Sequence, residues 1–246
     1  PEVGGVFAEG APKVFTLPAS SAFLDELARG LVDATNAREY PEALADALIF
    51  TPNQRAAREL ALSLYRAVEG TLLTPDIRTL GDIEEEDDSA AFGPEALDLP
   101  PALSAARRRG ALAKLIQFWR EKQGDERLPP SSLLSAADEL ATLIDQASLV
   151  GGVDWDKLRA LSDELAPSLA EHWQVSASFL DIVMHAWPKF LAEEHVTDAQ
   201  ARRLAAAEAL ATRWAAKPPK HPVIIAGSTG TGAATRRLME AALTLP

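Results

Sequence analysis

Apolar runs near the start of the chain alternate with stretches of helical periodicity. Residues 13–18 predict a short buried strand, and residues 19–34 predict a helix with serine hydroxyls at its start. Residues 47–52 predict a second strand, Asn53 a helix N-cap, and residues 54–68 a second helix. Two strand–turn–helix units in series favour a parallel sheet, because parallel strands need a crossover connection.

A weaker third strand is expected at residues 76–80. The acidic run that follows, at residues 83–88, predicts a solvated and mobile loop. The first part of the chain therefore predicts the strands and helices of one α/β domain.

From about residue 103 to 216 the pattern changes to helices alone, with pairs of Pro or Gly between them. Apolar side chains recur there at spacings of three and four, which predicts one buried face on each helix. Four tryptophans are therefore expected in the core, and Pro188 is expected to kink or divide its helix. The positions that carry the pattern are Leu112, Leu115, Ile116, Trp119, Leu133, Ala137, Leu140, Ile144, Ala147, Trp173, Leu180, Val183, Trp187, Phe190, Leu204, Ala207, Ala211 and Trp214.

Strand character returns at residues 222–226, followed by a glycine-rich loop and a helix at residues 233–243. A lone strand–helix unit cannot bury itself, so we expect it to rejoin the first sheet. The predicted organisation is an α/β domain formed by residues 1–100 and 217–246, interrupted by a mostly helical insertion at residues 101–216.

Composition narrows the class of protein. Of the 246 residues, 47% are hydrophobic, and the absence of Cys excludes disulfides, zinc–thiolate sites and iron–sulfur ligation. The chain shows no apolar run of about 18 residues and no signal-peptide pattern, so we expect a cytoplasmic protein without a membrane span. It begins without Met and stops directly after a predicted helix, from which we expect a piece of a longer protein.

The net charge of −12 means that the chain as a whole repels polyanions. Any nucleic-acid site must therefore be a local patch of positive charge.

The glycine-rich loop after the last strand is the first candidate site. Gly227 and Gly232 have the spacing of a Walker A motif, but Ala233 and Ala234 stand where that motif needs Lys and Ser/Thr. A working ATP site is therefore not expected. Backbone N–H groups of the loop could still cradle a phosphate, and the alternative is a flexible strand-to-helix turn. The residues of this possible phosphate loop are Gly227, Ser228, Thr229, Gly230 and Gly232.

A second candidate site lies where the second predicted strand ends. The polar residues there are Thr51, Asn53, Gln54 and Arg55, with Arg58 one helical turn further along. Short donors and a cation at a strand end and a helix N-terminus suit a nucleic-acid phosphate. A helix cap followed by a solvated basic face explains the same residues, so both interpretations stay open.

No pattern nominates a catalytic group, and no cofactor is expected. The four histidines lack metal-ligand spacing, and neither a Ser–His–Asp arrangement nor a G-x-S-x-G elbow is present. Further basic patches are most simply charged helix faces. They are formed by Arg107, Arg108, Arg109 and Lys114, by Arg202 and Arg203, and by Arg236 and Arg237.

Three segments in order resemble the amino-terminal region of the AddB family, subunits of the AddAB helicase–nuclease of bacterial double-strand-break repair. They are residues 14–20, 48–58 and 223–230, and the resemblance extends across the whole chain, including residues 77–82. It implies a parallel-sheet, P-loop or superfamily 1 helicase-like domain that is interrupted by a helical insertion. Residues 18–21 depart from the Walker A pattern of such a domain, which implies the loss of ATP turnover.

The resemblance also implies a role in DNA repair and recombination. Residues 51–55 fall where a helicase of this kind contacts the backbone of single-stranded DNA. The expected function is a non-catalytic fragment, not itself an enzyme, that helps form the DNA channel of the exonuclease complex and packs against an AddA-type motor subunit. The rival function is nucleotide or phosphate binding by the loop from Gly227 to Gly232, and a third is a scaffold that binds protein alone.

Overall fold

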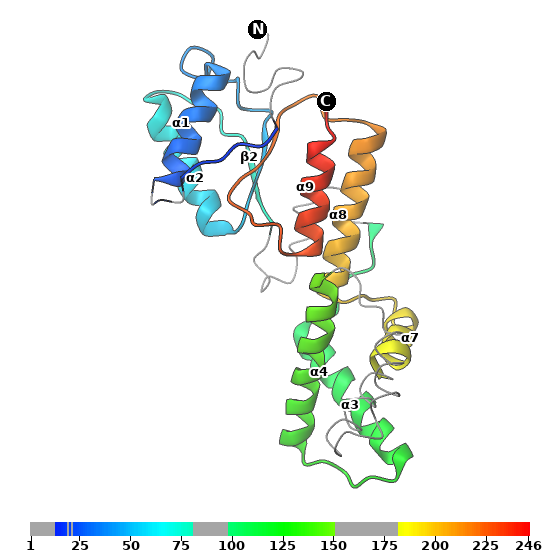
Figure 1. Cartoon of the computed structure of the whole chain (residues 1–246). Coiled ribbons are helices and arrows are strands. Elements are labelled where there is room, and N and C mark those ends of the chain that lie inside the picture. Colours follow the sequence, from blue (N-terminus) through cyan, green and yellow to red (C-terminus); the bar gives the residue numbers. More distant parts are fainter. Residues whose placement is uncertain (1–12, 19, 21, 81–97, 151–181) are drawn as a thin grey trace. The chain divides into compact units, whose positions relative to one another are not determined.

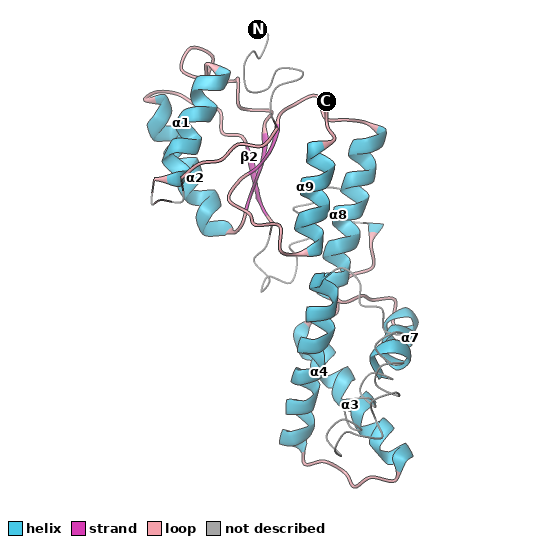
Figure 2. Ribbon diagram, in the orientation of Figure 1, coloured by secondary structure: helices cyan, strands magenta, loops and turns pink. Residues whose placement is uncertain are grey.

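The protein is described by a computed structural model that covers residues 13–18, 20, 22–80, 98–150 and 182–246 (Figures 1 and 2). The chain divides into two compact units, each with its own hydrophobic core. The sheet unit comprises Pro1–Gly93, Ala207–Gly230 and Thr235–Pro246. The helical unit comprises Pro94–Ala206 and Thr231–Ala234.

The sheet unit contains three parallel strands in the order β2-β1-β3. They are β1 (Leu48–Thr51), β2 (Asp76–Thr79) and β3 (Val223–Ile225), and Figure 2 shows them side by side. The parallel sheet and these three strands confirm the sequence prediction. Because all three strands run in one direction, their carboxyl ends share one edge of the sheet.

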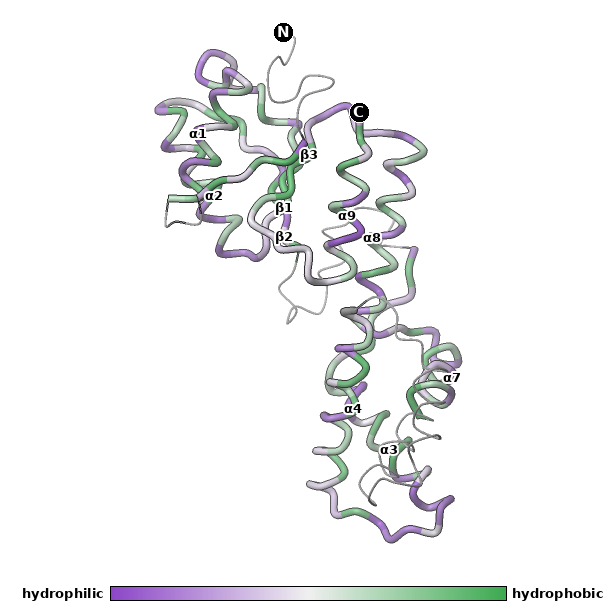
Figure 3. The backbone as a smooth tube through the Cα atoms, viewed as in Figure 1, coloured by the Kyte–Doolittle hydropathy of each residue, from purple (hydrophilic) through white to green (hydrophobic). Residues whose placement is uncertain are grey.

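Helices α1 (Phe23–Thr35) and α2 (Gln54–Val68) cover one face of the sheet (Figure 1). Side chains alternate between the two faces along a strand, and Ile49 of β1 points into the core shared with both helices. Figure 3 shows β1 and β3 in the green of hydrophobic residues, whereas β2 also contains hydrophilic residues. This core contains Ala28, Leu31, Val32, Ala37, Leu44, Ala47, Ile49, Leu60, Leu64 and Val68.

Helices α8 (Ala199–Ala216) and α9 (Ala233–Leu243) supply the other layer of the sheet unit, α8 through its part from Ala207 onward (Figure 1). Phe50, the neighbour of Ile49, packs edge-on against Trp214 of α8 with 6.4 Å between the ring centroids. The adjacent residues Ile49 and Phe50 of β1 thus pack against helices on opposite faces of the sheet.

Residues 13–18 are not a strand, contrary to the sequence prediction. Val14 is 70% exposed and Phe15 is 58% exposed, and the described residues show no ladder between this segment and the edge strand β3. A short apolar run does not determine a strand by itself, because its backbone groups also need a partner. Pro18 supplies no N–H for a ladder, and the Lys13 ammonium instead contacts backbone carbonyls at the end of α9.

The helical unit contains α3 (Ala105–Gln123), α4 (Pro130–Val150), the π-helical turn η5 (Ile182–Ala186), α7 (Trp187–Glu193) and the start of α8. The apolar positions predicted for α3 and α4 are buried or half-buried in its core. The predicted break at Pro188 is confirmed, because η5 gives way to α7 with Pro188 in its first turn.

Among the tryptophans expected in the core of this unit, Trp187 is buried and Trp119 is half-buried. Trp173 and Leu180 lie outside the described residues, as does the acidic run at residues 83–88.

A buried charge network holds the helical unit together. Asp198, directly before α8, accepts a hydrogen bond from Trp187 Nε1 at 2.6 Å. Arg108 Nε lies 2.8 Å from Asp198 Oδ1, as an ion pair without the alignment of a hydrogen bond, and Arg108 Nη1 donates to Asp145 Oδ2 at 2.8 Å. Burial raises the pKa of the Asp198 carboxyl, and the nearby Arg108 charge opposes that rise.

Candidate nucleic-acid interface

The carboxyl edge of the sheet is a topological switch point. From β1 the chain turns into α2 on one face, and from the neighbouring strand β3 it turns into α9 on the other face (Figure 1). In open parallel sheets, ligands bind outside the carboxyl ends of the strands where the connections diverge in this way. Both sites predicted from the sequence lie at this edge.

The two predicted sites meet around Gly227. A Cβ atom placed on Gly227 would lie 3.3 Å from Phe23 Cε1 and 3.6 Å from Pro52 Cγ. Gly227 also has a φ of 69°, a conformation that favours glycine. The start of α1, the turn between β1 and α2, and the glycine-rich loop are therefore in contact at one point of the edge.

Thr51 builds the turn after β1. It is fully buried, and its Oγ1 lies 3.3 Å from the Arg78 carbonyl oxygen and 3.4 Å from the Asn53 carbonyl oxygen. Gln54 Nε2 reaches toward Thr79 Oγ1 at 3.5 Å, at the end of β2. Of the predicted contact residues, Thr51 thus shapes the turn from inside, and it does not present its hydroxyl at the surface.

Asn53 caps α2, as the sequence predicts. Its side-chain oxygen accepts a hydrogen bond from the Ala56 N–H at 2.9 Å, and its backbone is extended. No acidic residue lies in the first turn of α2. The positive end of the helix dipole is therefore not offset by a carboxylate there, which favours an anion at this position.

Arg55 and Arg58 add full positive charges to this end of α2. Both are exposed, and neither guanidinium has a hydrogen bond or an ion pair within the described part of the chain. They are one helical turn apart, so both project from one side of α2. Two exposed arginines that no carboxylate of the described segments neutralises make this the strongest candidate contact for a polyanion.

The three consecutive arginines of α3 differ from that pair. Arg107 pairs with Glu194 at 3.3 Å, Arg108 with Asp145 and Asp198, and Arg109 with Asp138 at 2.6 Å. Arg237 likewise contacts Glu208. These four arginines are paired with carboxylates from distant parts of the sequence, which a sequence pattern alone does not reveal.

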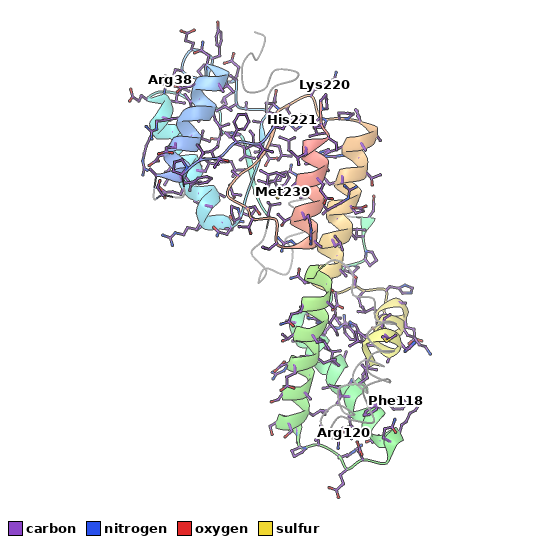
Figure 4. The ribbon with its side chains drawn as sticks, viewed as in Figure 1. Arg38, Phe118, Arg120, Lys220, His221 and Met239 are labelled. Atoms are coloured by element: carbon purple, nitrogen blue, oxygen red, sulfur yellow. The ribbon has the colours of Figure 1, made fainter. Side chains whose placement is uncertain are left out.

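The glycine-rich loop is partly engaged by its own side chains. The Gly230 N–H points to Ser228 Oγ at 3.4 Å. A Cβ at Gly230 would come within 3.0 Å of Met239 Sδ of α9, and Gly230 has a φ of 66° (Met239 is labelled in Figure 4). Gly227 and Thr229 are exposed, and Gly232 directly precedes α9. The loop geometry leaves both readings open, a phosphate cradle and a strand-to-helix turn.

The start of α1 uses its backbone N–H groups internally. The Ala22 N–H donates to Ser20 Oγ at 3.2 Å, and the Phe23 N–H donates to the Ser20 carbonyl at the same distance. Phe23 also places its ring against Gly227. The N–H groups of Ala22 and Phe23 therefore already have partners in Ser20, and the Phe23 ring lies beside the glycine-rich loop.

Two features escaped the sequence analysis. Leu62 and Tyr65 are exposed on the same face of α2 as Arg58, although their apolar character suggests a core position. A helical wheel could have found them, because they fall opposite Leu60 and Leu64. The sequence also gave little indication of the buried partner of Arg108, because Asp198 appears there only as an Asp directly before a predicted helix.

No family model, no curated protein and no solved structure matches this chain. The described residues contain no cluster of three or more His, Asp or Glu side chains suited to a metal ion. Among the same residues, no helix has the length and apolarity needed to cross a membrane.

Proposed function

We propose that the chain is a non-catalytic, helicase-like fragment of an AddB-type repair subunit, and that it contacts the backbone of single-stranded DNA at the carboxyl edge of its sheet. The observation that carries this proposal is the first turn of α2. Among the described residues, Arg55 and Arg58 have no carboxylate partner there, the first turn of α2 itself contains no acidic residue, and Asn53 caps the helix.

The chemistry of this contact is electrostatic. Guanidinium groups and helix N-termini bind phosphate oxygens, and they fix the position of a strand without reading its sequence. The net charge of −12 confines attraction for a polyanion to local patches of this kind. Strand separation and cleavage are assigned to other parts of the assembly, and packing against the motor subunit to other surfaces of this chain.

A second candidate function is the binding of a phosphate or nucleotide by the glycine-rich loop. It is favoured by the position of that loop at the switch point and by the left-handed conformations of Gly227 and Gly230. A ligand that binds only the native state raises the apparent melting temperature. A rise with ATP or inorganic phosphate that Gly227→Ala removes would favour this candidate.

The proposal is tested by fluorescence-anisotropy titration of labelled single-stranded DNA at low and moderate salt. We expect binding that weakens as salt rises, because counterions are released from each neutralised phosphate. A double-stranded oligonucleotide serves as the comparison for strand preference. The absence of binding even at low salt would contradict the proposal and leave a scaffold that binds protein alone.

A further inference from the structure

The exposed face of α2 has an unusual composition. The solvent side carries Arg55, Arg58, Leu62 and Tyr65 in one stripe, at spacings of three, four and three residues. The opposite side packs into the core of the sheet unit. Its buried residues are Ala57, Leu60, Ser63, Leu64 and Val68.

No described part of the chain covers the apolar half of this stripe. Leu62 is 50% exposed and Tyr65 is 66% exposed, and no ring contact of Tyr65 is present within the described residues. Glu59 and Arg66, which flank the stripe, pair with each other at 3.4 Å. Glu59 is thus partnered by Arg66, and within the described residues Arg55 and Arg58 have no ion pair beside the two exposed apolar side chains.

We propose that Tyr65 is a base-stacking residue for single-stranded nucleic acid and that Leu62 packs beside the stacked base. This proposal rests on the proposed function and extends it from a phosphate contact to a track along α2. With a rise of 1.5 Å per residue, the backbone of Tyr65 lies about 10 Å beyond Arg58, a distance of a few nucleotides. Proteins that bind single strands without sequence preference combine a cationic groove with aromatic side chains on which the bases stack.

Charge complementarity favours a nucleic-acid strand over a protein as the occupant. The stripe begins at the positive end of a helix and continues through two guanidiniums that form no ion pair with any described residue, so a repeated anion fits its first half. The bases of the same strand supply flat apolar faces for its second half. A single-stranded nucleic acid is therefore complementary to the whole stripe, with phosphates for the two arginines and bases for Leu62 and Tyr65.

The test compares Tyr65→Ala with Tyr65→Phe, using the chain's other tyrosine as the matched control. Tyr40 is 42% exposed and lies outside α2, so Tyr40→Ala removes a similar surface ring. We expect Tyr65→Ala to weaken single-strand binding by about 5- to 100-fold, with Tyr65→Phe and Tyr40→Ala close to wild type. The slope of log affinity against log salt should stay unchanged in Tyr65→Ala, because no phosphate contact is removed.

An abasic oligonucleotide of the same length separates stacking from a structural effect. It keeps the phosphates and lacks the bases, so wild type and Tyr65→Ala should bind it equally. The stacking role is overturned if wild type and Tyr65→Ala differ in their affinity for the abasic strand. It is also overturned if Tyr65→Ala binds the normal strand as tightly as Tyr40→Ala does. In either case the phosphate contact of Arg55 and Arg58 stands.

Two further outcomes have distinct meanings. If wild type binds no single strand at low salt, the proposed function fails and the stacking role fails with it. If Leu62→Ala and Tyr65→Ala alter self-association in sedimentation velocity and leave DNA binding unchanged, the stripe is a protein interface and the stacking role is overturned.

Discussion

The arginines of α2 and those of α3 belong to the same residue type in the same kind of element, yet their surroundings differ. Arg107, Arg108 and Arg109 each meet a carboxylate from another helix of the helical unit. Arg55 and Arg58 of the sheet unit meet none within the described residues. The charges of the first group are matched within the fold, whereas those of the second are not matched by any described residue.

Charge in the sequence is therefore a poor guide to a polyanion site unless its partners are known. Three consecutive arginines look stronger than two arginines a turn apart. Arg108, however, is almost buried between Asp145 and Asp198, where its charge is matched. The lesson is that the carboxylates around a cation decide its role, and these carboxylates lie up to about ninety residues away in the sequence.

The largest expected effect is on the stability of the helical unit. Asp198→Ala removes the more buried of the two carboxylates that pair with Arg108, together with the acceptor of the Trp187 N–H, and loss of one member of a buried pair costs about 3 kcal/mol in the free energy of unfolding. Urea unfolding followed by tryptophan fluorescence measures it. The control Asp138→Ala breaks the exposed pair with Arg109, which should cost at most about 0.5 kcal/mol. Equal effects of the two variants would mean that the buried network does not hold the unit.

A smaller effect is expected at the start of α2. Asn53→Ala removes the cap on the Ala56 N–H and should destabilise the sheet unit by about 1 kcal/mol. Asn53→Asp keeps the cap and adds a negative charge at the proposed phosphate contact. It should preserve stability in the same urea experiment and weaken single-strand binding. Unchanged binding in Asn53→Asp would place the DNA contact elsewhere.

The pH dependence of stability should carry the signature of Asp198. Because burial raises its pKa in the folded state above the unfolded value, its contribution to stability is present at low pH and lost as pH rises through the folded pKa. The stability of wild type relative to Asp198→Asn should therefore fall as pH rises from about 4. The groups that face this carboxyl are Arg108, Asp145 and the Trp187 N–H. If the stability of wild type relative to Asp198→Asn instead rises with pH, the Arg108 charge has a larger effect on the pKa of Asp198 than burial has.

The smallest effect on stability is expected for the arginines of α2. Arg55→Ala/Arg58→Ala removes no contact within the described residues and should change the free energy of unfolding by less than about 0.5 kcal/mol. Circular dichroism during urea titration provides the check. A larger loss would reveal a structural role for these side chains and weaken the contrast with α3.

Local patterns in the sequence predicted most elements of the sheet unit. The run before Asn53 became β1, Asn53 became the cap, and the helix after it spans Gln54–Val68. These features depend on neighbours in the chain, which a sequence displays directly. The strand expected at residues 13–18 was wrong because it required a distant pairing partner, and the apolar run does not show whether β3 supplies one.

The candidate site was predictable only in part. The sequence identified Arg55 and Arg58 and the glycine-rich loop as separate features, and the structure brings the turn before α2 against Gly227 through Pro52. The sequence did not separate the free arginines from the paired ones. That distinction depends on contacts such as the one between Arg107 and Glu194, which only the fold creates.

The most direct test of the central claim compares two matched double variants in a single-stranded DNA titration at low and moderate salt. Arg55→Ala/Arg58→Ala and Arg107→Ala/Arg109→Ala each remove two positive charges, so the change in net charge is the same. If Arg55 and Arg58 contact the strand, the first variant weakens binding and lowers the salt slope by about 1.4, whereas the second changes both very little. Equal losses in the two variants would contradict this contact, because binding would then follow net charge and not the unpaired arginines of α2.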